Sequence, residues 1–225
     1  MSLFNLTAVI PAAGIGKRVG ADIPKQYLQL LGKTIIEHSL EPFISHPEIN
    51  KVIVSIAEND CWFRRLAVAE HPKIEIVNGG KERVDSVLAA LQVINKNDYV
   101  LVHDAARPCI QRSDIDKLIS SVRLAEKGAI LASKVRDTMK RSSDSGNILE
   151  TVDRENLWHA LTPQMFLNKE LITAIETAAE PQNITDEASA MEMSGMAVNI
   201  VEGRSDNLKV TREEDLILAE LYLSQ

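Results

Sequence analysis

The sequence contains few of the residues that mark a secreted, membrane-bound or disulfide-rich protein. Its 225 residues include two cysteines, Cys61 and Cys109, which exclude a disulfide framework and favour a reducing compartment. No apolar run approaches the length of a membrane span, and no basic segment precedes the apolar N-terminal stretch as it would in a signal peptide. We therefore expect a cytoplasmic protein without membrane association.

Motifs for catalysis by histidine, serine or cysteine are also missing. The five histidines show no metal-ligand spacing, and there is no H-E-x-x-H, G-x-S-x-G or C-x-x-C pattern. His103, beside Asp104, is expected to pack beneath a site rather than to catalyse. The net charge of −7 argues against nucleic-acid binding. An anionic ligand therefore needs a local pocket of cations and backbone amides, which is typical of phosphoryl transfer.

A loop of small residues follows the first predicted strand, Thr7–Ile10. Small side chains let backbone N–H groups approach a polyphosphate, and nearby cations offset its charge. The P-loop pattern is absent, and Val19 stands where a dinucleotide fingerprint needs its third glycine. The loop therefore predicts a nucleoside triphosphate cradle, with an ordinary surface turn as the alternative. Its small residues are Ala12, Ala13, Gly14 and Gly16, and its cations are Lys17, Arg18 and Lys25.

Short apolar runs alternate with helical patterns along the chain. This alternation predicts an α/β fold with a Rossmann-like, mostly parallel twisted sheet flanked by helices. The length fits a single domain, 1–225. One helix is expected to begin at Thr34, with Glu37 completing a capping box, and to end at Pro42. The predicted strands are Thr7–Ile10, Lys51–Ile56, Lys73–Val77, Tyr99–Val102 and Ala129–Ala132.

The segment 134–156 breaks this alternation. Two extended runs, Val135–Lys140 and Ile148–Val152, flank a stretch of turn-forming residues and predict a hairpin. The hairpin is polar, and an isolated two-stranded hairpin is marginal in water. We therefore expect a protruding β arm held by a second copy of the chain, as a dimerisation element. A hairpin folded back on its own domain is the alternative.

Three further polar clusters follow predicted strands, where open parallel sheets bind their ligands. They are Asn78–Arg83 with Ser86 just beyond, His103–Pro108, and Glu202–Lys209. Asp104 at a strand tip suits Mg²⁺ at a triphosphate, while a helix cap or a pair with Arg107 is an equal alternative.

Seven motifs in this order resemble the 2-C-methyl-D-erythritol 4-phosphate cytidylyltransferase family over essentially the whole chain. Each motif alone is weakly specific, whereas the ordered set is strongly specific. The chain ends at Gln225 without the cyclodiphosphate synthase that some bacteria fuse to this domain, so we expect a monofunctional enzyme. The motifs are Pro11–Arg18, Pro24–Tyr27, His103–Pro108, Thr151–Arg154, Leu161–Gln164, Thr185–Ala188 and Asp206–Thr211.

The resemblance implies that CTP and 2-C-methyl-D-erythritol 4-phosphate, with Mg²⁺, give 4-diphosphocytidyl-2-C-methyl-D-erythritol and pyrophosphate. It implies that Arg18 and Lys25 stabilise the transition state. Mg²⁺ would be held mainly by the CTP phosphates, with Asp104 a possible ligand. The nucleotide-binding residues would be Ala12, Ala13, Gly14, Gly16, Gly80, Arg83 and Ser86, and those for the sugar phosphate Asp104, Arg107, Thr138, Arg154, Thr185 and Lys209.

The resemblance also implies a homodimer in which the arm crosses to the partner, so that Thr138 and Arg154 serve the partner's site. Lys81 departs from the acid that the family often has after Gly-Gly, which leaves a contact to the base open at that position. Two other functions are alternatives: a cytidylyltransferase for another polyol phosphate, such as ribitol 5-phosphate, and a non-catalytic nucleotide-binding dimer.

Overall fold

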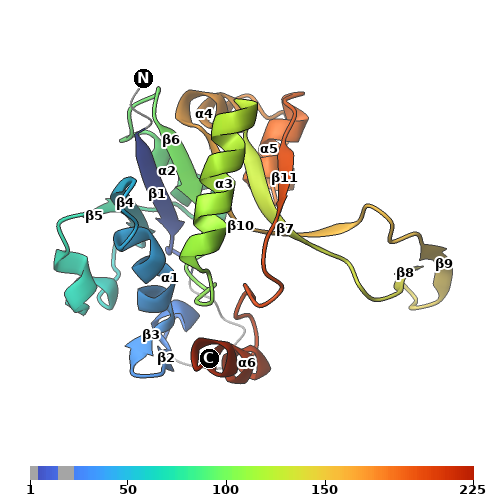
Figure 1. The fold of residues 1–225 in the computed structure, drawn as a ribbon, viewed down its shortest axis with the longest axis horizontal. Coiled ribbons are helices and arrows are strands. Elements are labelled where there is room, and N and C mark those ends of the chain that lie inside the picture. The colour runs from blue at the N-terminus through green and yellow to red at the C-terminus, as the bar shows by residue number, and fades with distance from the viewer. Residues whose placement is uncertain (1–4, 15–22) are drawn as a thin grey trace.

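The computed structural model describes residues 5–14 and 23–225. A seven-stranded sheet has the order β11-β7-β10-β6-β1-β4-β5. All neighbouring strands are parallel except where β10 runs antiparallel to β6 and β7. The mostly parallel α/β fold is therefore confirmed (Figure 1). The strands are β1 (Leu6–Pro11), β4 (Ile49–Ile56), β5 (Ile74–Asn78), β6 (Tyr99–Val102), β7 (Ala129–Lys134), β10 (Trp158–Leu167) and β11 (Asn199–Glu202).

Helices cover both faces of this sheet, because alternate strand residues bury apolar side chains on opposite sides. Ala8 and Ile10 of β1 pack into the same core as α1 (Ile35–Ile44) and α3 (Arg112–Ala125). Val9 packs on the other face with α2 (Arg83–Leu91), α4 (Asn168–Glu176) and α5 (Glu187–Met193). Among the described residues no helix is long and apolar enough to cross a membrane.

Smaller elements close one end of the sheet. Two short strands, β2 (Gln29–Leu30) and β3 (Lys33–Thr34), form a hairpin beside the C-terminal helix α6 (Glu213–Leu223), where Leu30, Val210 and Ala219 share a small core. The remaining helical turns are η2 (Lys25–Tyr27), η3 (Phe63–Arg65), η4 (Ala67–Glu70) and η5 (Pro181–Asn183).

The start of α1 is as predicted, whereas its end is not. Thr34 caps the helix and Glu37 completes the capping box. The helix continues past Pro42 to Ile44, so the predicted end was wrong. The fixed φ of proline is compatible with helix, and the burial of Phe43 in the core favours continuing the last turn over ending it.

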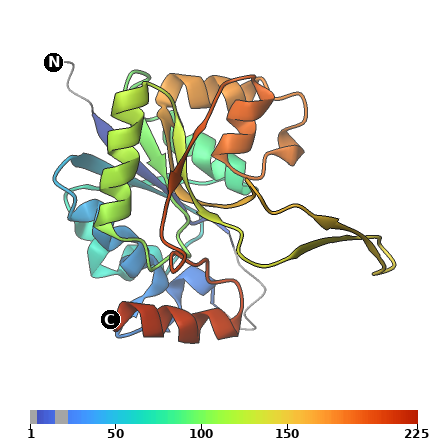
Figure 2. The ribbon, with the colours of Figure 1, turned by 45° about the vertical axis from the view of Figure 1, so that its right-hand side comes forward.

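The segment 134–156 forms the predicted hairpin, and it projects from the body of the protein (Figures 1 and 2). Its strands β8 (Met139–Ser142) and β9 (Ile148–Val152) pair antiparallel, with Lys140 opposite Thr151. Every residue of β8 is exposed, so the alternative of a hairpin packed on its own domain is wrong. Its partner stays a prediction.

Candidate functional site

A cavity of about 180 Å³ lies at the carboxyl ends of β1 and β6 and at the junction of β5 and α2. Residues from all four polar clusters predicted at strand ends line it, together with η2. The four clusters thus meet at one cavity. The lining residues are Pro11, Ala12, Ala13, Gly14, Lys25, Gln26, Gly80, Lys81, Glu82, Arg83, Ser86, Asp104, Ala105, Ala106 and Lys209.

Gln26 anchors the described start of the first loop. Its side-chain amide donates hydrogen bonds to the carbonyl oxygens of Ala12, at 2.8 Å, and Gly14, at 3.1 Å. Those carbonyls are thereby turned toward Gln26. Of the predicted loop residues, Gly16, Lys17 and Arg18 lie outside the described part of the chain.

The second wall is the glycine pair before α2. A Cβ at Gly79 would lie 2.6 Å from the Cβ of Ala13, so glycine is needed for the two loops to approach. The Gly80 N–H donates to the Ser86 hydroxyl oxygen at 3.1 Å, and that hydroxyl donates to the Glu82 carbonyl at 3.2 Å. Ser86, which is 2% exposed, thus shapes this loop as well as lining the cavity.

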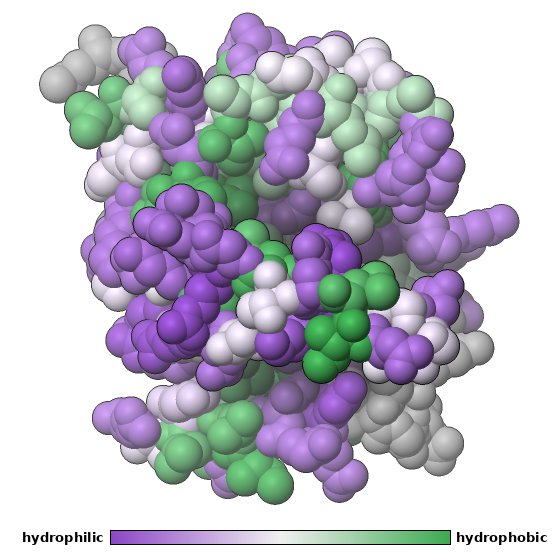
Figure 3. Space-filling model, turned by 90° about the vertical axis from the view of Figure 1, so that its right-hand side faces the viewer, coloured by the Kyte–Doolittle hydropathy of each residue, from purple (hydrophilic) through white to green (hydrophobic). Residues whose placement is uncertain are grey.

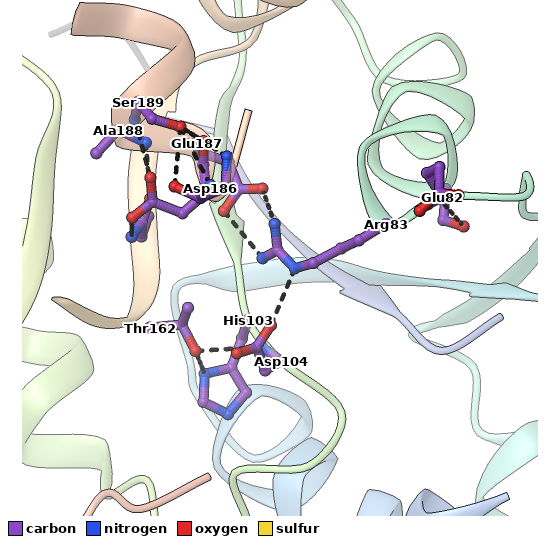
Figure 4. A network of polar contacts seen from close by, with 12 residues as sticks. Glu82, Arg83, His103, Asp104, Thr162, Asp186, Glu187, Ala188 and Ser189 are labelled. Atoms are coloured by element: carbon purple, nitrogen blue, oxygen red, sulfur yellow. Dashed lines mark hydrogen bonds and ion pairs between the residues drawn. The ribbon is translucent and has the colours of Figure 1, made fainter. Parts of the chain in front are cut away.

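Asp104 lies at the tip of β6 with three cations around it (Figure 4 draws Arg83). Its Oδ1 accepts from Arg83 Nε at 3.1 Å, and its Oδ2 lies 2.9 Å from Lys209 Nζ and 3.3 Å from Arg107 Nε. Burial raises the pKa of Asp104, but Arg83, Lys209 and Arg107 outweigh it and hold the pKa well below its usual range. Asp104 is therefore ionised at neutral pH, and both of its oxygens already carry cationic partners.

Arg83 has a second partner that the sequence did not reveal. Its Nη1 and Nη2 lie 2.6 and 3.1 Å from the two carboxylate oxygens of Glu187, so its guanidinium lies between Glu187 and Asp104 (Figure 4). Burial lowers the pKa of Arg83, and the two carboxylates more than offset this and raise it. Glu187 lies within the motif Thr185–Ala188, and its place in that motif is the one signal in the sequence that points to it.

His103 packs beneath the site, as expected. Its Nε2 faces the Arg107 carbonyl at 3.2 Å, and since a carbonyl only accepts, Nε2 carries the proton. Its Nδ1 therefore accepts from the Thr162 hydroxyl at 2.9 Å, and the same hydroxyl oxygen accepts from the Asp104 N–H at 3.2 Å. Burial lowers the pKa of His103 to about 4, so the ring is neutral at pH 7.

Lys25 links the N-terminal and C-terminal parts of the chain at the rim of the cavity. Its ammonium donates to the Val210 carbonyl at 2.8 Å, directly after Lys209. Val210 in turn donates its N–H to the Ala106 carbonyl at 2.8 Å. The predicted transition-state cation and one predicted sugar-phosphate cation are thus brought together.

The other predicted residues lie away from the cavity. Arg107 is buried behind Asp104 and donates to the Asn207 carbonyl at 2.8 Å. Thr185 precedes α5, while Thr138 and Arg154 are exposed in the arm segment, where Arg154 donates to the Arg136 carbonyl. Within one chain, Thr138 and Arg154 do not join Asp104.

A mostly parallel α/β sheet with a glycine-walled, cation-rich cavity at its strand ends is typical of proteins that bind nucleotide phosphates. The family model for 2-C-methyl-D-erythritol 4-phosphate cytidylyltransferase matches residues 6–225. A curated relative of that name from Aeromonas hydrophila is 61% identical over 222 residues, which cover 98% of this chain and 90% of the relative. One from Vibrio atlanticus is 54% identical over 227 residues, covering 99% and 97%.

Solved structures of the same name agree. That from Francisella tularensis has a TM-score of 0.82 at 37% identity, covering 97% of this chain and 99% of the other. That from Thermus thermophilus has a TM-score of 0.81 at 27% identity, covering 97% and 98%.

The chain belongs to the 2-C-methyl-D-erythritol 4-phosphate cytidylyltransferase family. It is an enzyme that transfers CMP from CTP to 2-C-methyl-D-erythritol 4-phosphate, giving the diphosphocytidyl product and pyrophosphate in isoprenoid precursor biosynthesis. The resemblance seen in the sequence is confirmed. The two rival functions, another polyol phosphate and a non-catalytic dimer, are set aside.

The neutral, buried His103 makes stability depend on pH. Its folded-state pKa of about 4 lies below the ordinary value of 6.5, so the unfolded chain binds an extra proton between these values and stability falls as pH drops through this window. From pH 7 to pH 5 this group should remove about 2 kcal/mol from the free energy of unfolding. Urea unfolding at both pH values measures the loss.

In the His103→Gln variant the pH-dependent loss should shrink by about that amount, roughly 2 kcal/mol. His159, which is exposed, supplies the matched control, and His159→Gln should leave the loss unchanged. An undiminished loss in His103→Gln would contradict a neutral, buried ring.

Proposed function

We propose that the cavity is the CTP half of the active site and that Asp104 and Lys209 begin the acceptor half. The observation that carries this proposal is the meeting of Lys25, Arg83 and Lys209 around one glycine-walled cavity in a chain of net charge −7. Such a local excess of cations draws two mutually repelling anions into contact, which is the central difficulty of this reaction.

In the CTP half, small residues and backbone groups face the nucleotide. The loops around Gly14 and Gly80 approach the base and the phosphates because no side chains intervene. Lys25 and Arg18 contact the triphosphate and offset the charge that develops at the α-phosphorus. The remaining nucleotide-binding residues are Ala12, Ala13, Gly16, Arg83 and Ser86.

In the acceptor half, the ionised Asp104 carboxylate accepts hydrogen bonds from hydroxyl groups of the polyol. Lys209 and Thr185 complete the binding of the sugar phosphate on this side, and Arg107 supports it from behind Asp104. The acceptor's phosphate has a second pKa near 6 and is largely dianionic at neutral pH. Its oxygen attacks the α-phosphorus, the bond from that phosphorus to the bridging oxygen breaks, and pyrophosphate leaves. No proton has to be removed, so no general base is needed.

Mg²⁺ enters as part of the substrate, bound to the CTP phosphates. Across residues 5–14 and 23–225 no group of three or more histidine, cysteine or acidic side chains could hold a metal ion. Asp104 is a poor direct ligand because both of its oxygens face cations. Bound Mg²⁺ supplies further positive charge at the transferred phosphate.

The arm completes the acceptor half of a second subunit, which makes the active form a homodimer. Figure 3 shows the side of the molecule from which the arm projects. On this side, green hydrophobic side chains lie among purple hydrophilic ones. In the arm, Met139, Ile148 and Leu149 are 38%, 66% and 62% exposed. Burial against a partner would stabilise this hairpin, which has no core of its own. Thr138 and Arg154 then serve the partner's site.

The enzyme works in the cytoplasm, whose reducing environment suits its two cysteines. Both cysteines are free thiols, with Cys61 exposed and Cys109 buried. An exposed free thiol suits a reducing compartment.

The base pocket should select CTP over the other nucleoside triphosphates. With 2-C-methyl-D-erythritol 4-phosphate as acceptor, kcat/KM for UTP, ATP and GTP should be at least about 100-fold lower, because a hydrogen-bonding site rejects a base that leaves its polar groups unpaired. Pyrophosphate release measures this, with ribitol 5-phosphate as the control acceptor. Comparable turnover of UTP would contradict the assignment of the base pocket.

The Lys25→Ala variant should separate transition-state stabilisation from ground-state binding. We expect kcat to fall by about 100-fold or more while KM for CTP changes by less than about threefold, because the ammonium acts on charge that develops during transfer. Lys33→Ala, at an exposed lysine nearby in sequence, is the control. A raised KM with unchanged kcat would assign Lys25 to uniform binding.

Mixing two inactive variants tests the arm. If Arg154 serves the partner's site, a dimer of one Lys25→Ala and one Arg154→Ala subunit contains one intact site and one doubly defective site. Subunit exchange of equal amounts should restore roughly a quarter of the unsubstituted activity, since half of the dimers are mixed and each has one working site. No recovery after proven exchange would place Arg154 in its own subunit's site.

A further inference from the structure

Glu187 is a buried carboxylate at the first position of α5, with 3% of its surface exposed. Both of its oxygens accept from the two terminal nitrogens of Arg83, at 2.6 and 3.1 Å. This bidentate arrangement fixes the plane of the guanidinium as well as its position. A buried charge of this kind is retained only with a complete set of partners.

The third nitrogen of the same guanidinium contacts the proposed acceptor site. Arg83 Nε donates to Asp104 Oδ1 at 3.1 Å (Figure 4). Because the guanidinium is rigid and planar, the position of Glu187 determines where Nε points. The Oδ1 atom of Asp104 therefore receives one N–H of Arg83, while the other two contacts of the fork are held by Glu187.

Glu187 is itself held in place by the sheet. Gln164 of β10, 1% exposed, donates to Asp186 Oδ2 at 2.8 Å and accepts from the Ala188 N–H at 2.9 Å. These two hydrogen bonds clamp the residues on both sides of Glu187. The carboxylate thus has a fixed position relative to β10, which lies beside β6 and its Asp104.

We propose that Glu187 is a positioning residue for the acceptor, acting through Arg83 on Asp104. This inference rests on the proposed place of the acceptor at Asp104. Glu187 holds two of the Arg83 nitrogens away from Asp104, so Oδ1, which accepts from Arg83 Nε, keeps a lone pair for a hydroxyl group of the polyol. Without that partner, the Arg83 fork turns a second donor onto Asp104 and occupies that lone pair.

The Glu187→Gln variant keeps the size of the side chain and removes its charge. KM for 2-C-methyl-D-erythritol 4-phosphate should rise about tenfold or more, the size of one lost charge-assisted hydrogen bond, while KM for CTP should rise clearly less, because Arg83 is only one of several groups that line the nucleotide half. Glu192→Gln, at an exposed position of the same helix, is the matched control and should change neither constant. Equal changes in both KM values would overturn the proposal, because they indicate a general structural role.

A double-substitution cycle tests whether Glu187 acts through Arg83. Arg83→Lys removes the planar fork, so adding Glu187→Gln to it should raise the acceptor KM by less than about twofold more. Full additivity would overturn the proposal. Thermal unfolding of each variant corrects the rates for folded protein, and should Glu187→Gln not fold, Glu187→Asp, which is too short to reach both nitrogens, carries the same KM comparison.

Asp104→Asn distinguishes a failure of this inference from a failure of the proposed function. If Asp104→Asn raises the acceptor KM while Glu187→Gln does not, the inference alone fails. If Asp104→Asn leaves that KM unchanged, the acceptor does not bind at Asp104 and the proposed site fails with it.

Discussion

The site depends on the ion pairs that the ionised carboxylate of Asp104 makes with three cations. This carboxylate gathers Arg83 from the start of α2, Arg107 from the loop after β6, and Lys209 from the segment after β11. These cations come from distant parts of the chain and would repel one another without it. Removing one partner from a buried ion cluster of this kind typically costs about 3–5 kcal/mol. The network therefore fixes the relative positions of three loops as well as the local charge.

The cleft combines a structural need with a chemical one. Around Asp104 and Glu187, three cations face two carboxylates, and Lys25 adds a fourth cation at the rim. The site therefore stays positive within an acidic protein, while each buried charge still has a partner. At the proposed site these groups are arranged before substrate arrives, so little reorganisation would be needed as charge develops during the reaction.

Much of this could be predicted from the sequence because local signals and topology agree. Apolar runs gave the parallel strands, and the rule that ligands bind at strand ends brought Gly80, Asp104 and Lys209 to one cavity. The pairing of Arg83 with Glu187 could not be predicted, since it joins residues 104 positions apart and no pattern marks a long-range ion pair. The helix end predicted at Pro42 was wrong because the burial of Phe43 outweighed the tendency of proline to end a helix.

The bond between Lys25 and the Val210 carbonyl spans 185 residues and has a consequence for biosynthesis. Lys209 and Val210 follow β11, the last strand of the sheet in chain order. During translation, every sheet strand is synthesised before the segment that closes the cleft. The segment that closes the cleft therefore leaves the ribosome after every strand of the sheet, and Lys209 is the last of the three Asp104 cations to emerge.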